Sequence, residues 1–429
     1  MNATGLMWEN APSLGALLVF AEHRYFGRSL PFPSGPLQHL RYLSAEQALA
    51  DYAALLFHLS GALFPPDTPV VAVGGSYGGM LAAWLRLKYP GAVDGAIAAS
   101  APVLSFFGET PEYDPSGYYA VVTSDASPRC QEVMRSVWEM MESLSQTPQG
   151  LSTLSGAFQL CSPVESWGEV SSLLFPWISG ASSFLAMGDY PYPSSYITNG
   201  GCLLPPWPMD AACAHLEAIP NGAKPEVVLQ ALREFAGTFY NCSKDLSCFD
   251  IKGSVNNQTL LDGLLWDYLW CAEITQPFAQ NGRTDMFWPL PFNLSESEAA
   301  CAQSWGVALR PEWATVEFGG RRALRQASNI LFTNGQLDPW KAGGVRESLA
   351  PSVEAIVIEK AAHHLDLMFS NPLDPPSVLQ ARAAQLAHIK QWIEEKKQSE
   401  REGQGRALEG LGGPRLGRGL GQGRVEKSL

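Results

Sequence analysis

Apolar runs alternate with amphipathic stretches over the first hundred residues of the chain. Three short runs are almost wholly apolar, as expected for strands that are buried on both faces: residues 16–21, 69–73 and 95–99. Residues 44–59 place apolar side chains along one helical stripe behind a capping box formed by Ser44 and Gln47, and residues 80–88 predict a second helix. This alternation predicts an α/β fold with a doubly wound, mostly parallel sheet.

A different pattern occupies the middle of the chain. Between residues 105 and 310, helical runs are broken by aromatic and proline-rich loops. The earlier pattern then resumes, with two strands and a final helix predicted at residues 329–333, 355–358 and 377–396. We therefore expect one α/β domain, made of residues 1–104 and 311–397, that is interrupted by a mainly helical cap, residues 105–310. Residues 398–429 are rich in Gly and Arg, and they predict a disordered tail without an assigned function.

The composition is that of an ordinary globular protein. Of 429 residues, 46% are apolar and 17% are charged, which excludes a wholly disordered chain and a small scaffold held only by disulfides. Lys and Arg number 29 against 42 Asp and Glu, and the net charge of −13 argues against nucleic acid as a partner. The longest uncharged stretch, residues 170–188, contains five Ser, two Gly and one Pro, which predicts a buried helix or loop and no membrane span.

Cysteine usage indicates an oxidising compartment. All eight cysteines lie between residues 130 and 301 and none has C-x-x-C spacing, so we expect disulfides within the cap and no metal site there. Four sequons agree with passage through the secretory route and are candidate glycosylation sites: Asn2, Asn241, Asn257 and Asn293. These features predict a lysosomal or secreted protein, although residues 1–8 lack the basic and apolar regions of a signal peptide.

The segment from Gly74 to Gly78 fits the G-x-S-x-G pattern of a nucleophile elbow and lies between an apolar strand and a helix. In such a turn the strained serine, here Ser76, presents its hydroxyl at the start of the helix, and the glycines let strand and helix approach. The backbone N–H of Tyr77 would be one donor to the oxyanion formed during acyl transfer. The alternative is a glycine-rich turn with an unreactive serine.

Two later segments supply candidates for the base and its partner carboxylate. Asp338 follows the strand predicted at residues 329–333, and His363 follows the next predicted strand. This order of serine, carboxylate and histidine is typical of enzymes in which the carboxylate holds the histidine in the tautomer that accepts the serine proton. Use of His363, His364 and Asp366 as metal ligands is a weaker alternative, because adjacent histidines lack the spacing of a metal site. We therefore expect neither a metal nor a cofactor.

Six segments within residues 1–396 resemble one family of serine exopeptidases. The likeness is carried by residues 2–8, 17–27, 74–80, 189–192, 334–340 and 362–367. They are similar to the family of lysosomal prolyl carboxypeptidase and dipeptidyl peptidase II. This resemblance implies an α/β-hydrolase fold with a helical cap, peptide substrates that contain proline, and a catalytic triad of Ser76, Asp338 and His363.

Members of this family cleave beside proline in two ways. One kind releases the C-terminal residue that follows a penultimate proline, and the other releases an N-terminal dipeptide that ends in proline. The chain is more similar to the first kind at residues 2–8, 160–163 and 206–208, and it lacks the acidic loop of the second kind between Cys248 and Cys271. We therefore expect release of a C-terminal residue, with dipeptidyl peptidase activity as the main alternative. A lipase or esterase is a further enzyme class that the elbow alone allows.

The resemblance also assigns a substrate pocket. Met80, Met286 and Trp340 would form flat, soft walls around the proline ring, whereas the alternative for each is packing in a core. Met368 stands where the family carries Arg. The chain begins after the family's signal peptide, opening strands and second oxyanion loop, so a truncated inactive product is another alternative. The sequence leaves the oligomeric state open, and a homodimer is one option.

Overall fold

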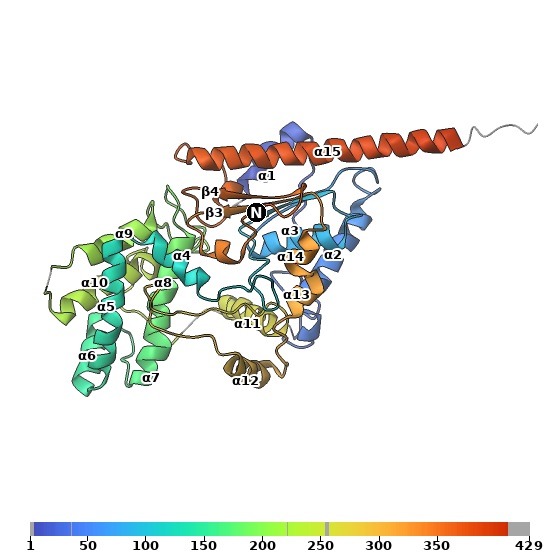
Figure 1. Ribbon diagram of the computed structural model, residues 1–429. Coiled ribbons are helices and arrows are strands. Elements are labelled where there is room, and N and C mark those ends of the chain that lie inside the picture. Colours follow the sequence, from blue (N-terminus) through green and yellow to red (C-terminus); the bar gives the residue numbers. More distant parts are fainter. Residues whose placement is uncertain (1–3, 36, 221, 254–256, 411–429) are drawn as a thin grey trace, which may run out of the picture.

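A parallel sheet forms the centre of the protein. The computed structural model describes residues 4–35, 37–220, 222–253 and 257–410 (Figure 1). Within these residues one sheet has four parallel strands in chain order: β1 (Val71–Gly75), β2 (Gly95–Ala99), β3 (Ile330–Gly335) and β4 (Val353–Ile358). The α/β fold with a parallel sheet that the apolar runs predict is therefore confirmed.

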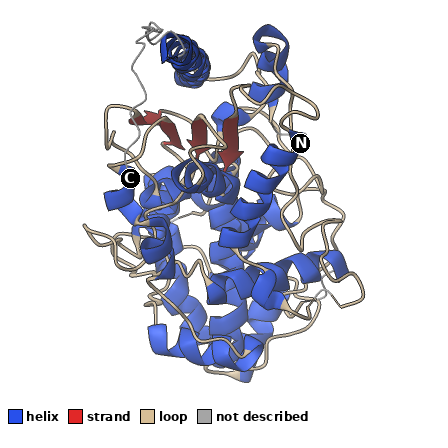
Figure 2. Ribbon diagram, turned by 90° about the vertical axis from the view of Figure 1, so that its right-hand side faces the viewer, coloured by secondary structure: helices blue, strands red, loops and turns tan. Residues whose placement is uncertain are grey.

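Helices cover both faces of the sheet (Figures 1 and 2). The helices of these two layers are α1 (Gly5–Leu14) and α15 (Pro376–Gly410) above the strands, and α2 (Ala45–Leu59) and α3 (Tyr77–Lys88) below them in Figure 1. Ile97 of β2 packs with Leu6 of α1 and Trp392 of α15, whereas its neighbours Ala96 and Ala98 belong to the core cluster that includes α2 and α3. Because successive side chains of a strand point to opposite faces, a strand covered on both sides is apolar throughout.

Local signals in the sequence explain several helix boundaries. Ser44 precedes α2, and its side chain accepts a hydrogen bond from the N–H of Gln47 at 3.0 Å, as the capping pattern predicts. The remaining short elements near the sheet are α13 (Trp313–Phe318), α14 (Gly320–Leu324) and the 3₁₀ turns η1 (Leu40–Tyr42), η3 (Pro339–Gly343) and η4 (Leu365–Leu367). The last two turns follow β3 and β4, so they lie at the carboxyl end of the sheet.

The insertion between β2 and β3 forms a helical cap. Its helices are α4 (Gly117–Asp125), α5 (Pro128–Ser145), α6 (Pro148–Ala157), α7 (Trp167–Glu169), α8 (Phe175–Met187), α9 (Pro208–Glu217), α10 (Pro225–Tyr240), α11 (Asn257–Ala272) and α12 (Leu294–Trp305). A π-helical turn, η2 (Val170–Leu174), joins α7 to α8. Buried side chains such as Trp138, Ile178 and Leu232 form an apolar cluster of the cap itself. Figure 1 shows α4 to α10 gathered to one side of the sheet, with α11 and α12 beneath it.

Four disulfides brace this cap, which confirms the prediction from cysteine usage. The pairs are Cys130–Cys213, Cys161–Cys248, Cys202–Cys242 and Cys271–Cys301. The first joins the start of α5 to α9, and the last joins α11 to α12. They close loops of 30 to 87 residues, and such cross-links stabilise the fold mainly by restricting the unfolded chain.

One helical stretch has the length and the apolar composition of a membrane span. Among the described residues, only Trp167–Met187 is long and apolar enough to cross a bilayer by length and composition. Half of its most apolar window is buried inside the protein, where α8 packs against α9 and α10. Its apolar side chains therefore contribute to the core of the cap.

The structure differs from the predicted elements at two places. Residues 16–21 do not form a strand: they have no regular secondary structure and pair with no strand, and Leu17 is 60% exposed. A strand needs a hydrogen-bonded neighbour, and β1 is paired on one side only, with β2. Secondly, α15 continues to Gly410, into the segment for which the sequence predicts disorder. Glu, Gln, Arg, Ala and Leu in this part of the chain favour helix, which explains the extension.

Candidate active site

A sharp turn joins β1 to α3 at the carboxyl end of the sheet. Its central residue, Ser76, has a φ of 59° and a ψ of −129°, a strained backbone conformation for a residue with a side chain. The Ser76 N–H donates to Ala99 O at 2.9 Å, which ties the turn to the end of β2. Ser76 directly precedes α3, and its side chain makes no capping hydrogen bond. The hydroxyl thus stands at a helix N-terminus without capping it, in the arrangement that the elbow pattern predicts.

The elbow requires glycine at two positions. A Cβ on Gly74 would lie 2.1 Å from Gly78 O, and a Cβ on Gly79 would lie 2.7 Å from Ala99 O. A Cβ on Gly78, by contrast, would meet no atom within 4 Å. The close approach of strand and helix therefore depends on Gly74 and Gly79, because any larger residue would collide with backbone atoms.

The structure brings His363 and Asp338 into direct contact. His363 Nδ1 lies 3.0 Å from Asp338 Oδ2, and both side chains are buried. Asp338 Oδ1 accepts a hydrogen bond from Trp340 N–H at 3.1 Å, which fixes the carboxylate at the start of η3. A carboxylate that accepts a hydrogen bond from Nδ1–H leaves the other ring nitrogen free to accept a proton.

The loop that carries His363 also packs against the elbow; we define this histidine loop as residues 359–367. The His364 N–H donates to Ser100 Oγ at 2.8 Å, and Ser100 follows Ala99, the acceptor for Ser76. A Cβ on Gly75 would lie 2.8 Å from His364 Cδ2. The elbow and the histidine loop are thus both anchored at the end of β2.

His364 and Asp366, which flank the loop's turn beside His363, make hydrogen bonds to other elements. His364 Nε2 lies 3.1 Å from the hydroxyl of Tyr196, and burial holds the pKa of His364 well below its ordinary value, so its ring is neutral. The carboxylate of Asp366 accepts hydrogen bonds from Thr333 Oγ1 at 2.6 Å and from Gln385 Nε2 at 2.5 Å. Burial raises the pKa of Asp366, while these donors oppose the shift. Both residues therefore fix the histidine loop.

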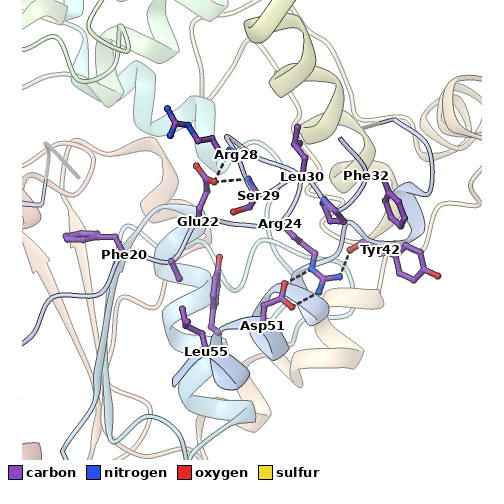
Figure 3. Close-up of a pocket in the computed structure, with 13 residues that line it drawn as sticks. Phe20, Glu22, Arg24, Arg28, Ser29, Leu30, Phe32, Tyr42, Asp51 and Leu55 are labelled. Carbon is purple, nitrogen blue, oxygen red and sulfur yellow. Dashed lines mark hydrogen bonds and ion pairs between the residues drawn. The ribbon is translucent and has the colours of Figure 1, made fainter. Parts of the chain in front are cut away.

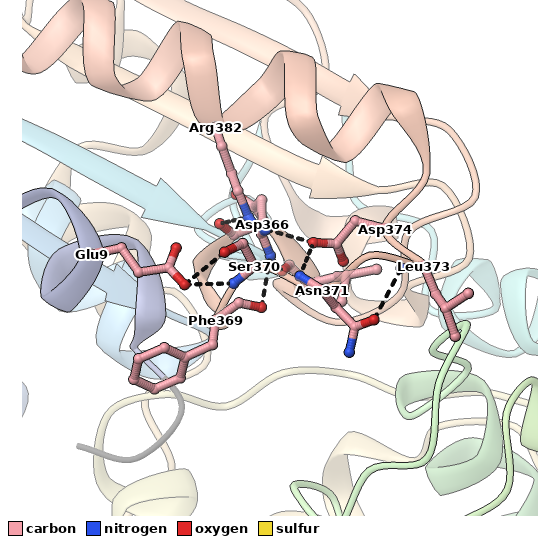
Figure 4. Close-up of polar contacts among 9 residues, drawn as sticks. Glu9, Asp366, Phe369, Ser370, Asn371, Leu373, Asp374 and Arg382 are labelled. Carbon is pink, nitrogen blue, oxygen red and sulfur yellow. Dashed lines mark hydrogen bonds and ion pairs between the residues drawn. The ribbon is translucent and has the colours of Figure 1, made fainter.

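Arg382 on α15 supports the same loop from behind (Figure 4). Its guanidinium donates to Leu365 O and to Asp366 O at 3.1 Å each, and it pairs with the carboxylate of Asp374 at 2.6 Å. Arg382 and Asp374 are both buried, so this fork satisfies backbone carbonyls that water does not reach. Met368, which directly follows the histidine loop, is buried in an apolar cluster. The cationic contacts to the loop described here come from Arg382.

Tyr77, the residue after Ser76, is half-buried and packs against the core of the sheet domain. Its hydroxyl lies 3.2 Å from His23 Nε2, and its ring makes an edge contact with Trp266 of α11 at 5.2 Å between centroids. Burial raises the pKa of Tyr77 well above its ordinary value, so the phenol stays neutral. These contacts fix the first turn of α3, where the Tyr77 N–H points out of the helix N-terminus.

The three residues that the resemblance assigns to a proline pocket occupy two clusters. Met286 and Trp340 pack in the cap cluster, and the Trp340 ring makes edge contacts with Tyr118 and Phe278 at 5.1 and 5.7 Å. Trp340 Nε1 is buried without a hydrogen-bond partner. Met80 is buried in the other cluster, that of the sheet and α3. Met286 and Trp340 therefore belong to the same cluster, and Met80 lies on the elbow helix.

Two cavities open elsewhere on the described surface. A cavity of about 720 Å³ lies between the loop at residues 20–32 and α2 (Figure 3). Arg24 in its wall is paired with Asp51 at 2.6 Å, and Glu22 accepts hydrogen bonds from the backbone of Arg28 and Ser29. A second cavity of about 690 Å³ lies in the cap beside α9 and α10. Neither cavity is lined by Ser76 or His363.

The candidate glycosylation sites are only partly covered by the structure. Asn293 is exposed at the start of α12, where its side chain accepts a hydrogen bond from Glu296 N–H. Asn241 follows α10, and its amide is bonded to the backbone of Leu246. Asn2 and the side chain of Asn257 lie outside the described residues. Asn293 is thus accessible to modification.

Sequence reasoning missed residues that support the histidine loop. Ser100 has a positive φ of 48° and is fully buried, but nothing in its neighbourhood of the sequence marks it. Arg382 lies on the buried face of α15 with Val378 and Gln385, and a charged residue on a buried helix face is the signal that could have identified it. Tyr190 lies in a segment that resembles the family, yet its partner is 173 residues away in the chain.

Comparison with known proteins agrees with this geometry. A parallel sheet with an inserted helical cap is the fold of an α/β hydrolase. Residues 1–385 match the family described as "Serine carboxypeptidase S28", so the chain belongs to the serine carboxypeptidase S28 family. The chain is 43% identical over 400 residues to the "Lysosomal Pro-X carboxypeptidase" of Homo sapiens, covering 91% of this chain and 78% of that protein. It is 41% identical over 399 residues to the protein of that name in Mus musculus, with the same coverage.

A more distant relative shares the same span. The "Thymus-specific serine protease" of Mus musculus is 28% identical over 410 residues, which cover 91% of this chain and 77% of that protein. The predicted family and fold are confirmed, and the protein is a serine peptidase of the hydrolase class.

Proposed function

We propose that this protein is a Pro-X carboxypeptidase that releases the C-terminal residue following a penultimate proline, with Ser76, His363 and Asp338 as its catalytic triad. The observation that carries the proposal is the buried contact of His363 Nδ1 with Asp338 Oδ2, on a loop that packs against the strained Ser76 elbow. Relatives that bear this activity in their names, at 43% identity over 91% of the chain, support the choice of substrate.

The acylation step follows from the roles of these three side chains. Ser76 Oγ attacks the carbonyl carbon of the penultimate proline while His363 Nε2 accepts the hydroxyl proton. Asp338 stabilises the imidazolium that forms, because its carboxylate accepts the hydrogen bond from Nδ1–H. The Tyr77 N–H, at the start of α3, stabilises the oxyanion of the tetrahedral intermediate. His363 then gives its proton to the departing amine, and the C–N bond breaks.

Hydrolysis of the acyl-enzyme uses the same groups in reverse. His363 Nε2 takes a proton from a water molecule, whose oxygen attacks the proline carbonyl of the ester. Collapse of the second tetrahedral intermediate breaks the bond to Ser76 Oγ, which recovers its proton from His363. The neutral form of His363 is needed at the start of both steps.

Met80, Met286 and Trp340 form the proline pocket in this proposal. Trp340 follows Asp338 by two residues, so a ring that contacts its indole face is close to the triad carboxylate. The flat face of Trp340, in an aromatic setting with Tyr118 and Phe278, suits a proline ring. Its buried, unpartnered Nε1–H is available to a carbonyl oxygen of the substrate.

A lysosomal or secreted location fits the physical properties of the chain. The four disulfides require an oxidising route, and exposed Asn293 is a suitable glycan acceptor. Burial raises the pKa of Glu273 and of Asp189 to about 7, so these carboxyls are uncharged in an acidic lumen. The protein is thereby suited to work at low pH.

The test is release of phenylalanine from an N-blocked peptide that ends in Pro-Phe, measured at acidic pH beside the Ser76→Ala variant. We expect release by the unaltered protein alone, with a loss on the order of 10⁴-fold or more in the variant. An equally folded Ser76→Ala protein that still releases phenylalanine would contradict the triad. Cleavage of an X-Pro dipeptide amide or of a simple ester, without release of phenylalanine, would instead favour a dipeptidyl peptidase or an esterase.

A further inference from the structure

The backbone of His363 is held by the cap, although the histidine loop belongs to the sheet domain. The His363 N–H donates to Met187 O, at the end of α8, at 3.2 Å. The hydroxyl of Tyr190, three residues further along the cap, donates to His363 O at 2.9 Å. Tyr190 and His363 are both buried, so water does not replace either bond. Both polar groups of the His363 backbone therefore have partners in the cap.

Tyr190 reaches this position as a side chain of the cap inserted into the sheet domain. Its ring lies in an apolar cluster with Ala362 and Leu365 of the histidine loop and Val378 of α15. Burial raises the pKa of Tyr190 well above its ordinary value. The phenol is therefore a neutral donor at acidic and neutral pH.

The segment that carries Tyr190 is itself tightly fixed. The Tyr190 carbonyl accepts a hydrogen bond from Trp207 N–H at 2.8 Å, and the carboxylate of Asp189 accepts one from Met209 N–H at 3.0 Å. Both donors lie at the start of α9, so the bonds tie Tyr190 to that helix. Cys213, further along α9, is joined by a disulfide to Cys130 of α5. The Tyr190 hydroxyl is thus held in place through α9, which a disulfide links to α5.

We propose that Tyr190 is a positioning residue through which the cap places the imidazole of His363 for proton transfer. The proposal rests on the function proposed above, which makes His363 the general base. The imidazole is fixed at one end by Asp338 and at the other by its own backbone, which the Tyr190 hydroxyl and Met187 O hold. Displacement of a catalytic group by about 1 Å lowers a rate by about 100-fold, so one lost bond is expected to slow proton transfer without weakening substrate binding.

The test compares Tyr190→Phe with Tyr240→Phe as a matched control. The Tyr240 hydroxyl also donates to a backbone carbonyl, Trp177 O, at 3.1 Å, but within the cap and away from the histidine loop. Both variants keep the ring and lose one hydroxyl-to-carbonyl bond. We expect Tyr190→Phe to lower kcat for the Pro-Phe peptide by about ten- to 100-fold with KM within about twofold, and Tyr240→Phe to leave both values unchanged.

A second readout separates this proposal from the proposed substrate. A fluorophosphonate reacts with an activated serine whatever peptide the enzyme prefers: an Oγ–P bond forms, fluoride leaves, and the serine proton passes to the histidine. If the unaltered protein is not labelled at Ser76, the triad itself is wrong. If it is labelled, and folded Tyr190→Phe is labelled at the same rate, the positioning role is wrong. A slower rate for Tyr190→Phe alone, recovered when 4-aminophenylalanine restores a donor at this position, supports it.

Discussion

At the scale of single residues, the site depends on the hydrogen bonds and the charge states of a few buried side chains. One carboxylate oxygen of Asp338 accepts from His363 and the other accepts from the Trp340 N–H. His364 is neutral because burial lowers its pKa. The carboxylate of Asp338 is therefore hydrogen-bonded to the imidazole of His363, and the neighbouring imidazole of His364 carries no charge. This matters in the proposed mechanism because a charged imidazole beside His363 would change the proton affinity on which both proposed chemical steps depend.

The role of Asp338 can be tested by Asp338→Asn. The amide oxygen still accepts from Trp340 N–H, so the turn is preserved, but the amide group favours the wrong tautomer of His363. We expect kcat for the Pro-Phe peptide to fall by about 10³- to 10⁴-fold with a small change in KM. Asp51→Asn is the control, because Asp51 pairs with Arg24 beside the cavity of Figure 3 and does not contact the triad candidates. A folded Asp338→Asn protein within tenfold of full activity would contradict the assignment.

Sequence motifs identify the candidate catalytic residues, and they say little about the residues that position them. The order of Ser76, Asp338 and His363 can be predicted from the sequence because each follows an apolar strand in a recognisable motif. Ser100 and Tyr190 act on the histidine loop through single hydrogen bonds across 264 and 173 residues of chain. Such contacts exist only once the fold has brought the segments together, so no local pattern could predict them.

At the scale of elements, the turn from β1 to α3 combines backbone strain with close packing. Ser76 has a positive φ, and the surrounding glycines admit the helix against the ends of two strands. The strained residue is held by α3 on one side and by its N–H bond to Ala99 on the other. Strain at such a turn persists only while neighbouring elements impose it.

The packing argument predicts different costs for two glycines of the same turn. Gly74→Ala places a Cβ 2.1 Å from Gly78 O, so we expect it to lower the free energy of unfolding by about 1–3 kcal/mol. Gly78→Ala lies within α3, where the added Cβ meets no atom within 4 Å, and its effect should be within about 0.5 kcal/mol. Urea unfolding followed by tryptophan fluorescence measures both. Equal destabilisation by the two substitutions would show that packing against Gly78 O does not constrain the turn.

Two elements show where local patterns reach their limit. β2 was predictable because all five of its residues are buried, and burial on both faces makes a strand apolar throughout. Residues 16–21 are equally apolar but unpaired, because strand formation depends on a hydrogen-bonded neighbour that the pattern of one segment does not contain. The apolar pattern thus reports the preference of a segment, and pairing decides its structure.

At the scale of the whole molecule, buried carboxyls on separate parts of the chain favour an acidic medium. Glu273, at the end of α11, accepts a hydrogen bond from the N–H of Ala45 at the start of α2, so it joins the cap to the sheet domain. Asp189 joins the segment of Tyr190 to α9 within the cap. Both are buried, and burial raises the pKa of each to about 7. Ionisation of these groups therefore acts on the contacts that position the cap.

The pH dependence of stability follows from the direction of these shifts. Burial raises the pKa of Glu273 from 4.5 to about 7, so the folded chain binds more protons than the unfolded chain between these values. Its contribution is present below about pH 4.5 and is lost as the pH rises through 7. Burial lowers the pKa of His364, which acts in the opposite sense, so the effect of Glu273 is isolated by comparing a variant with the unaltered protein at each pH.

Glu273→Gln keeps an oxygen that accepts from Ala45 N–H and removes the ionisable group. We expect its free energy of unfolding to match that of the unaltered protein near pH 4.5 and to exceed it by about 3 kcal/mol near pH 8. The reason is that the variant lacks the carboxyl group whose pKa rises by about 2.5 units on folding. Glu226→Gln, at an exposed site in the first turn of α10 and not among the groups that act on Glu273, is the control and should show no such difference. Urea unfolding over this pH range measures it. A difference that does not change with pH would mean that Glu273 ionises in the folded protein as it does in the unfolded chain.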